Sequence, residues 1–288
     1  MIAISLDELT KACGGRLVGG PGARLITSVS TDSRKCRGAP FFALKGEHQD
    51  GHAFTAGALK GGATCLVISD ERALLAGIPA LLVPDTLEAL QQLSRLVREK
   101  SPVRIAALTG SCGKTTTKEL TRSILSRACG ITPEEVLATS GNFNNDIGVP
   151  LTLLELTRHT RLAIVEQGAS HIGDIARTNR LVQADAGLIT QIGRAHLEGF
   201  GSEDGIYRGK CELIEDVLRR GGEAWVPGVE PWHERFLSDF KSAAGAGRLR
   251  FFGTVSGTAH ALNLVLAKNL PSPEGRFIKL RTEAGLVE

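Results

Sequence analysis

One eight-residue segment, TGSCGKTT at residues 109–116, restricts the possible folds of this chain more than any other. It stands between Arg104–Leu108, an apolar run that predicts a buried strand, and Lys114–Arg127, which predicts a helix. Glycines in such a turn let backbone N–H groups point at phosphate oxygens, and the helix N-terminus adds partial positive charge there. The segment therefore predicts a phosphate-binding loop in an α/β protein.

The residue types of this loop indicate a nucleotide with a bound metal ion. Lys114 can reach the β- and γ-phosphates, and the hydroxyl of Thr115 can ligate Mg²⁺. The strict form of the motif has glycine five residues before Gly113, where this chain has Leu108, so the loop is a shortened form. A strand–helix turn with a chance Gly-Lys-Thr is the alternative. The predicted cofactor-binding residues are Gly110, Ser111, Cys112, Gly113, Lys114, Thr115 and Thr116.

Strands and helices alternate after the loop. The run Leu162–Val165 precedes a helical pattern over Ile172–Leu181, and Gly187–Ile192 precedes another over Lys210–Arg219. This alternation predicts a mostly parallel sheet with helices on both faces.

The first hundred residues carry a smaller α/β pattern. Cys65–Ile68 and Ala80–Val83 predict strands, and apolar residues recur at helical spacing over residues 85–100. Because Ser101-Pro102 breaks this helix, we place a domain boundary there, between residues 1–100 and residues 101–288.

Two side chains near the ends of later strands point to the same site as the loop. Glu166 ends the run Leu162–Val165, where a nucleotide hydrolase has a metal-binding acid, and His196 follows Gly187–Ile192. Ligands of open α/β sheets bind beyond the carboxyl ends of the strands, so we expect both residues on one rim with the loop. A strand-end carboxylate and a structural histidine are the alternatives.

Residues 141–150, GNFNNDIGVP, are dense in turn formers. A plain loop explains the glycines. The three amides of Asn142, Asn144 and Asn145 suit the sugar and phosphate oxygens of a polar substrate, so we predict that they contact one.

Composition excludes several classes of protein. The net charge of +3 over 288 residues is too small to indicate a nucleic-acid surface. None of the six cysteines forms a C-x-x-C pair, and the N-terminus has no signal-peptide pattern. The longest apolar stretch, Ala73–Pro84, is far shorter than the about 20 residues that a membrane helix needs. We expect a cytoplasmic, monomeric protein without a transmembrane segment.

Several segments together resemble the Mur ligase family of ATP-dependent ligases. They are TGSCGKTTTKEL, GNFNNDIGVPLTLL, AIVEQGAS, AHLEGFGS and YRGKCELI. STDSRK and FFALKGEHQDGHAF resemble the uridine-nucleotide-binding domain of the same family. The resemblance covers nearly the whole chain, and GNFNNDIGVP together with AHLEGFGS is more specific than a lone Gly-Lys-Thr.

The resemblance implies roles for individual residues. Lys114 and Thr115 would hold the ATP phosphates and the first Mg²⁺. The catalytic and metal-site residues would also include Glu166, His196 and Lys210, and Lys210 matches a lysine that several family members carbamylate to place a second Mg²⁺. The implied substrate contacts are Asp32, Ser33 and Arg34 for the uridine diphosphate, and Asn142, Asn144 and Asn145 for the muramoyl group or phosphates. A solvated lysine at a helix end is the alternative for Lys210.

The resemblance also implies a reaction in the synthesis of peptidoglycan precursors. ATP would phosphorylate the terminal carboxylate of a UDP-N-acetylmuramoyl tripeptide, and the amine of D-Ala-D-Ala would attack the resulting acyl phosphate. Two features depart from the family pattern: Cys112 stands where Asn is usual, and the chain stops before a Gly-x-His-Asn segment and a third domain. We therefore expect a truncated chain. Another Mur ligase, a folylpolyglutamate synthase-like ligase and a non-catalytic nucleotide-binding fragment remain alternatives.

Overall fold

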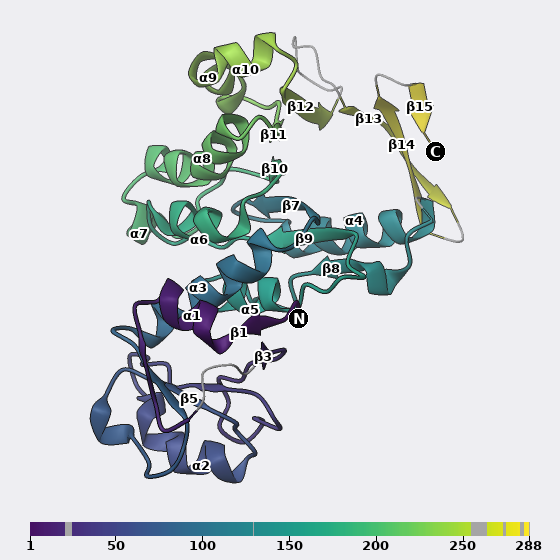
Figure 1. Cartoon of the computed structure of the whole chain (residues 1–288). Coiled ribbons are helices and arrows are strands. Elements are labelled where there is room, and N and C mark those ends of the chain that lie inside the picture. Colours follow the sequence, from purple (N-terminus) through teal and green to yellow (C-terminus); the bar gives the residue numbers. More distant parts are fainter. Residues whose placement is uncertain (21–24, 129, 255–263, 273–274, 283–284, 288) are drawn as a thin grey trace. The chain divides into compact units, whose positions relative to one another are not determined.

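The chain packs into two compact units (Figure 1). Unit 1 comprises Met1–Val103, Ile131–Ala163 and Arg180–Val182, and unit 2 comprises Arg104–Gly130, Ile164–Asn179 and Gln183–Glu288. The computed structural model describes residues 1–20, 25–128, 130–254, 264–272, 275–282 and 285–287. The predicted α/β class, with a small N-terminal domain followed by a mostly parallel sheet, is confirmed. The boundary after residue 100 stays a proposal, since residues 131–163 pack with unit 1.

A four-stranded sheet forms the centre of unit 1. Its order is β2 (Arg16–Val18), β6 (Ala80–Leu82), β5 (Leu66–Ile68) and β4 (Phe41–Phe42). The strands β4, β5 and β6 run parallel, and β2 runs antiparallel to β6. The two apolar runs predicted as strands are β5 and β6, which are buried in a core with Phe41 and Ala58. Continuous apolar runs fit this position, because strands covered on both faces need no polar alternation.

The helix α3 (Thr86–Glu99) confirms the helix predicted over residues 85–100. The Asp85 carboxylate accepts a hydrogen bond from the Glu88 backbone N–H at 2.9 Å and caps the first turn. Leu90, Leu93 and Val97 are fully buried along one face. The remaining elements of unit 1 are β1 (Ile4–Ser5), α1 (Leu6–Ala12), β3 (Leu25–Ile26), η1 (Gly51–Phe54), α2 (Thr55–Lys60), η2 (Glu71–Ala73), η3 (Pro133–Glu135), β8 (Val136–Ala138) and α5 (Gly148–Leu154).

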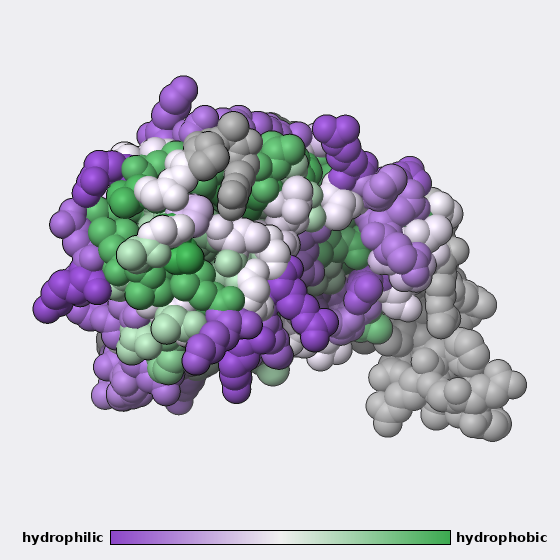
Figure 2. Space-filling model, turned by 60° about the horizontal axis from the view of Figure 1, so that its bottom comes forward, coloured by the Kyte–Doolittle hydropathy of each residue, from purple (hydrophilic) through white to green (hydrophobic). Residues whose placement is uncertain are grey.

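Some large apolar side chains are exposed to solvent. Figure 2 turns the bottom of Figure 1 forward and shows hydrophobic residues gathered on that side and bordered by hydrophilic ones. In unit 1 the most exposed large apolar side chains are Leu25, Phe143 and Phe54.

A large sheet runs through unit 2 in the order β15-β14-β13-β12-β11-β10-β7-β9. Neighbouring strands from β7 to β13 pair parallel, and β14 pairs antiparallel with both β13 and β15. The strands are β7 (Arg104–Thr109), β9 (Leu162–Glu166), β10 (Ala186–Ile189), β11 (Glu223–Pro227), β12 (Leu249–Thr254), β13 (Leu264–Ser272), β14 (Gly275–Thr282) and β15 (Gly285–Val287). The helices are α4 (Lys114–Ala128), α6 (Asp174–Val182), α7 (Leu197–Phe200), α8 (Glu203–Arg219), α9 (Trp232–Asp239) and α10 (Lys241–Gly245).

The helix α8 begins seven residues before the predicted start at Lys210. The Ser202 hydroxyl accepts a hydrogen bond from the Gly205 N–H at 2.9 Å and caps the first turn. Gly205 and Gly209 lower the intrinsic helix propensity of this turn, so the sequence pattern hides it. Both glycines pack against Phe200, whose atoms would lie 2.1 and 2.4 Å from an added Cβ. The Ser202 cap and the packing of Phe200 against these glycines therefore define the start of this helix.

Candidate active site

The phosphate loop lies between β7 and α4, as predicted. Gly110 has a φ of +150°, and a Cβ on it would meet the Thr190 hydroxyl at 2.0 Å. Gly113 has a φ of +81°, a conformation that other residues rarely adopt. Both positions therefore require glycine.

The segment that follows β10 braces the loop. The Ser111 N–H donates to the Gln191 carbonyl at 2.9 Å, and the Ser111 hydroxyl donates to the Gly193 carbonyl at 2.9 Å. The Thr190 hydroxyl donates to the Cys112 carbonyl at 2.6 Å. These contacts fix the backbone whose N–H groups would face phosphate oxygens.

Glu166 and Thr115 form one pair at the carboxyl ends of the strands. The Thr115 hydroxyl donates to Glu166 Oε2 at 3.0 Å, and Glu166 is only 2% exposed at the end of β9. Lys114 Nζ, from the same helix turn as Thr115, donates to the Gly110 carbonyl at 2.8 Å. Loop, lysine, hydroxyl and carboxylate thus meet at one rim.

This rim fits a magnesium ion bound mainly by non-protein oxygens. Among the described residues, no three His, Cys, Asp or Glu side chains are grouped so that they could hold a metal. Mg²⁺ is commonly held by one or two protein oxygens together with substrate phosphates and water. The Thr115 hydroxyl and the Glu166 carboxylate could supply that number of ligands beside the phosphate loop.

Lys210 lies in the middle of α8 and is 1% exposed. The alternative of a solvated lysine at a helix end is therefore wrong, because α8 begins earlier than predicted. Its Nζ donates to the Ala169 carbonyl at 3.4 Å and lies 5.2 Å from the centre of the Phe200 ring. Burial, with a smaller contribution from the charge of Lys114, lowers the pKa of Lys210 to about 8. A neutral amine, the form that reacts with CO₂, is thus accessible near neutral pH.

Two carboxylates that the sequence analysis missed hold the segment facing Lys210. Asp174 Oδ2 accepts the Ser170 and His171 N–H groups, both at 2.8 Å. Glu212 accepts the Gly173 N–H at 2.5 Å and the Ala176 N–H at 2.8 Å. The spacing of Glu212 two residues after Lys210 carries no recognisable signal, because its partners are distant in sequence.

His196 immediately precedes α7 and has an exposed side chain. Its backbone φ of +57° is left-handed, which is uncommon for a residue other than glycine. This position follows β10, as predicted, while its role as a metal ligand stays a prediction.

Unit 1 contains a pocket of about 620 Å³ that includes all three residues predicted to bind the uridine diphosphate. This volume lies within the usual range for small-molecule sites. Arg34 donates to both carboxylate oxygens of Asp32 at 2.9 Å, and its side chain is 83% exposed. Hydrogen bonds from Arg34 lower the pKa of Asp32 to about 2. The lining residues are Thr31, Asp32, Ser33, Arg34, Phe41, Leu44, Gln49, Gly51 and Phe54.

The asparagine-rich loop belongs to unit 1, whereas the phosphate loop belongs to unit 2. The Asn145 side-chain oxygen accepts the Ile147 and Gly148 N–H groups at 3.2 and 2.8 Å. This oxygen therefore shapes the turn that precedes α5. The predicted substrate contacts of Asn142, Asn144 and Asn145 stay predictions.

Comparison with known protein families assigns most of this chain to one family. Residues 108–267 of the 288 match the Mur ligase middle domain. The chain belongs to the Mur ligase family. Residues 25–98 match a second model of that family, described as its catalytic domain.

Relatives described as ligases of one type are similar over most of this chain. The UDP-N-acetylmuramoyl-tripeptide–D-alanyl-D-alanine ligase of Haemophilus influenzae is 44% identical over 222 residues, which cover 77% of this chain and 48% of that protein. A crystal structure of MurF from Acinetobacter baumannii matches with a TM-score of 0.84 and 35% identity, covering 99% of this chain and 60% of that one. MurF of Thermotoga maritima in complex with ADP matches with a TM-score of 0.75 and 26% identity over 90% of this chain and 56% of that one.

The chain thus spans about half the length of the curated relatives it matches. No helix among the described residues has the length and apolar character needed to cross a membrane.

Proposed function

We propose that this chain contributes the nucleotide and uridine-nucleotide sites of a UDP-N-acetylmuramoyl-tripeptide–D-alanyl-D-alanine ligase of peptidoglycan synthesis. The observation that carries the proposal is the rim at which the braced phosphate loop, the Thr115–Glu166 pair and the buried Lys210 lie on neighbouring elements of unit 2. Similarity to ligases of this type over 77% of the chain supports the choice within the family.

Each residue of the rim has a distinct task in this proposal. The loop N–H groups and Lys114 would hold ATP phosphates, and Thr115 and Glu166 would hold Mg²⁺. ATP supplies the phosphoryl group that activates the carboxylate of the peptide, so that D-Ala-D-Ala can attack it. The rim is rich in fixed donors, which stabilise the charge that accumulates during such a transfer.

Lys210 fits the role of a carbamylated metal ligand. Its neutral amine would attack the carbon of CO₂ and lose one proton, which leaves a carbamate with two oxygen atoms. A cation would thereby become an anionic oxygen ligand for a second Mg²⁺, with His196 as a further metal ligand in the proposal. Burial favours the neutral amine that this addition requires.

The pocket of unit 1 would take the uridine diphosphate of the UDP-N-acetylmuramoyl tripeptide. The polar residues Asp32, Ser33 and Arg34 are part of its lining. Arg34 would contribute charge-assisted hydrogen bonds to phosphate, which are stronger than neutral ones. Asn142, Asn144 and Asn145 remain proposed contacts of the muramoyl group or the phosphates. We also propose that the protein is cytoplasmic and monomeric.

A ligand panel tests this function against the alternatives. Calorimetry should show binding of UDP-N-acetylmuramoyl tripeptide at least about 10-fold tighter than binding of UDP-N-acetylmuramoyl-alanine, and no binding of a folate. A folate ligand that binds tighter would favour a folylpolyglutamate synthase-like ligase. Preference for the shorter muramoyl substrate would favour another Mur ligase.

A further inference from the structure

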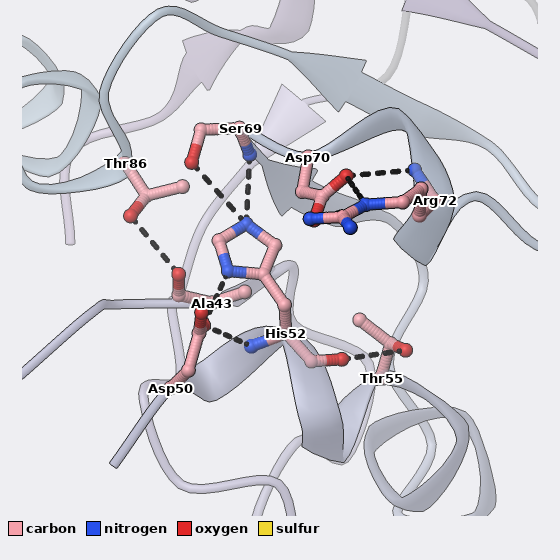
Figure 3. A network of polar contacts seen from close by, with 8 residues as sticks. All are labelled: Ala43, Asp50, His52, Thr55, Ser69, Asp70, Arg72 and Thr86. Atoms are coloured by element: carbon pink, nitrogen blue, oxygen red, sulfur yellow. Dashed lines mark hydrogen bonds and ion pairs between the residues drawn. The ribbon is translucent and has the colours of Figure 1, made fainter. Parts of the chain in front are cut away.

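Asp50, His52 and Ser69 form a chain of polar contacts beside the pocket of unit 1 (Figure 3). His52 Nδ1 lies 2.5 Å from Asp50 Oδ1, and His52 Nε2 accepts the Ser69 backbone N–H at 2.8 Å. The imidazole is nearly enclosed, with 8% of its side-chain surface exposed. The ring therefore joins the start of η1 to the end of β5.

These contacts define which nitrogen of His52 carries the proton. A backbone N–H can only donate, so Nε2 must present its lone pair to Ser69. Nδ1 then carries the hydrogen and donates it to Asp50. The same Asp50 oxygen accepts the His52 backbone N–H at 2.9 Å, and these donors lower the pKa of Asp50, which keeps it ionised at neutral pH.

The arrangement has the residue types of a Ser-His-Asp catalytic triad but a different geometry. The Ser69 hydroxyl oxygen lies 3.3 Å from Nε2, whereas the amide nitrogen of the same residue lies at 2.8 Å. Because Nε2 has a single lone pair and the amide occupies it, the ring is not available to accept the hydroxyl proton. The geometry therefore indicates a tether between two backbone segments.

The tethered segment, residues 43–54, supplies four of the residues that line the pocket: Leu44, Gln49, Gly51 and Phe54. Its first end is joined to β5 by the Ala43 N–H, which donates to the Val67 carbonyl at 3.0 Å. Within it, the Gly51 N–H donates to the Leu44 carbonyl at 2.8 Å, and a Cβ on Gly51 would meet backbone atoms at 2.7 Å. His52 fixes the second end to the residue that follows β5.

We propose that His52 is a positioning residue that holds the 43–54 wall of the pocket in the shape that binds a uridine diphosphate. The choice of ligand rests on the proposed function of this pocket. The tether itself rests on the contacts of His52 with Asp50 and Ser69, and can be tested without a ligand.

Two substitutions at His52 separate its two contacts. In His52→Gln the side-chain oxygen can replace Nε2 and accept the Ser69 N–H. In His52→Asn the shorter amide can replace Nδ1 and donate to Asp50, but it cannot reach Ser69. We expect the Asn variant to bind UDP about 10-fold more weakly than wild type, the effect of one lost hydrogen bond, and the Gln variant to stay within about 3-fold.

Two further variants serve as matched controls. Ser69→Ala removes the hydroxyl and keeps the backbone N–H, so UDP affinity should not change. Asp70→Asn breaks the neighbouring ion pair with Arg72, whose side chain does not line the pocket, and should also leave affinity unchanged. Loss of binding in Ser69→Ala would overturn the assignment of the tether to the backbone.

Hydrogen–deuterium exchange tests the role of His52 separately from the proposed ligand of the pocket. Residues 43–54 should exchange faster in His52→Asn than in wild type or His52→Gln, measured without UDP. If exchange follows this order but wild type does not bind UDP, the tether stands and the proposed function of the pocket fails. If the Asn and Gln variants show equal exchange and equal affinity, the proposed role of His52 is wrong.

Discussion

The phosphate-loop rim of unit 2 and the Asp32–Arg34 pocket of unit 1 place their charged side chains in different surroundings. Lys210 and Glu166 are 1% and 2% exposed, and backbone carbonyls or hydroxyls hold them. The Arg34 side chain is 83% exposed and pairs with a residue two positions away. The free energy of a buried charge depends on the groups that surround it, whereas water screens an exposed ion pair. Changes at the rim should therefore affect folding and binding together, and changes at Arg34 should affect binding alone.

The largest effect is expected from Gly110→Ala. The added Cβ would meet the Thr190 hydroxyl at 2.0 Å, on a backbone with φ of +150°. We expect a loss of at least about 2 kcal/mol in the free energy of unfolding and a loss of nucleotide binding. Gly193→Ala is a matched control, because its Cβ would lie 3.7 Å from Ser111, an ordinary contact. Equal urea midpoints for the two variants would contradict the proposed packing of the loop.

An effect of comparable size, but opposite in sign and dependent on pH, is expected from Lys210→Met. Burial lowers the pKa of Lys210 from 10.5 to about 8 in the folded state. Between these values the unfolded chain binds more protons, so the stability of wild type rises with pH. Below pH 8 the free energy of unfolding of the methionine variant should therefore exceed that of wild type by on the order of 3 kcal/mol. This difference should vanish by about pH 10.5. Urea denaturation across this range, in metal-free buffer, measures it; a difference that does not change with pH would contradict the burial of the amine.

The smallest effect on stability is expected from Arg34→Ala. The ion pair with Asp32 is exposed, so the free energy of unfolding should stay within error of wild type. UDP affinity should fall about 10-fold, because a charge-assisted contact to phosphate would be lost. Arg72→Ala, which removes a similar exposed pair outside the pocket, provides the control. An unchanged Kd for UDP in Arg34→Ala would remove this residue from the proposed site.

The sequence predicted the parts of the molecule that local patterns determine. The strand–loop–helix around Lys114, the helix after Asp85 and the strands β5 and β6 depend on nearby residues, and each lies within two residues of its expected place. The motif containing Asp32 lines a pocket of unit 1, and its contact with a substrate stays a prediction.

Long-range contacts explain what the sequence did not predict. The start of α8 is an exception, because its contacts with Ser202 and Phe200 are local, but Gly205 and Gly209 lower the helix propensity of the sequence there. Thr190 braces a loop that lies about eighty positions earlier in the chain, and His52 binds Ser69, which follows it only after α2 and β5. Such pairs have no fixed spacing, so only the folded chain brings them together.

Calorimetric titration with ADP, in the presence and absence of Mg²⁺, tests the central claim most directly. We predict that wild type binds Mg²⁺-ADP, and that Thr115→Ala and Glu166→Gln each weaken this binding about 10-fold or more. In EDTA the three proteins should bind ADP equally, because the pair acts through the metal. Thr121→Ala, on the same helix, should behave as wild type. Failure of wild type to bind, or equal affinities of all variants in Mg²⁺, would contradict a nucleotide site at this rim.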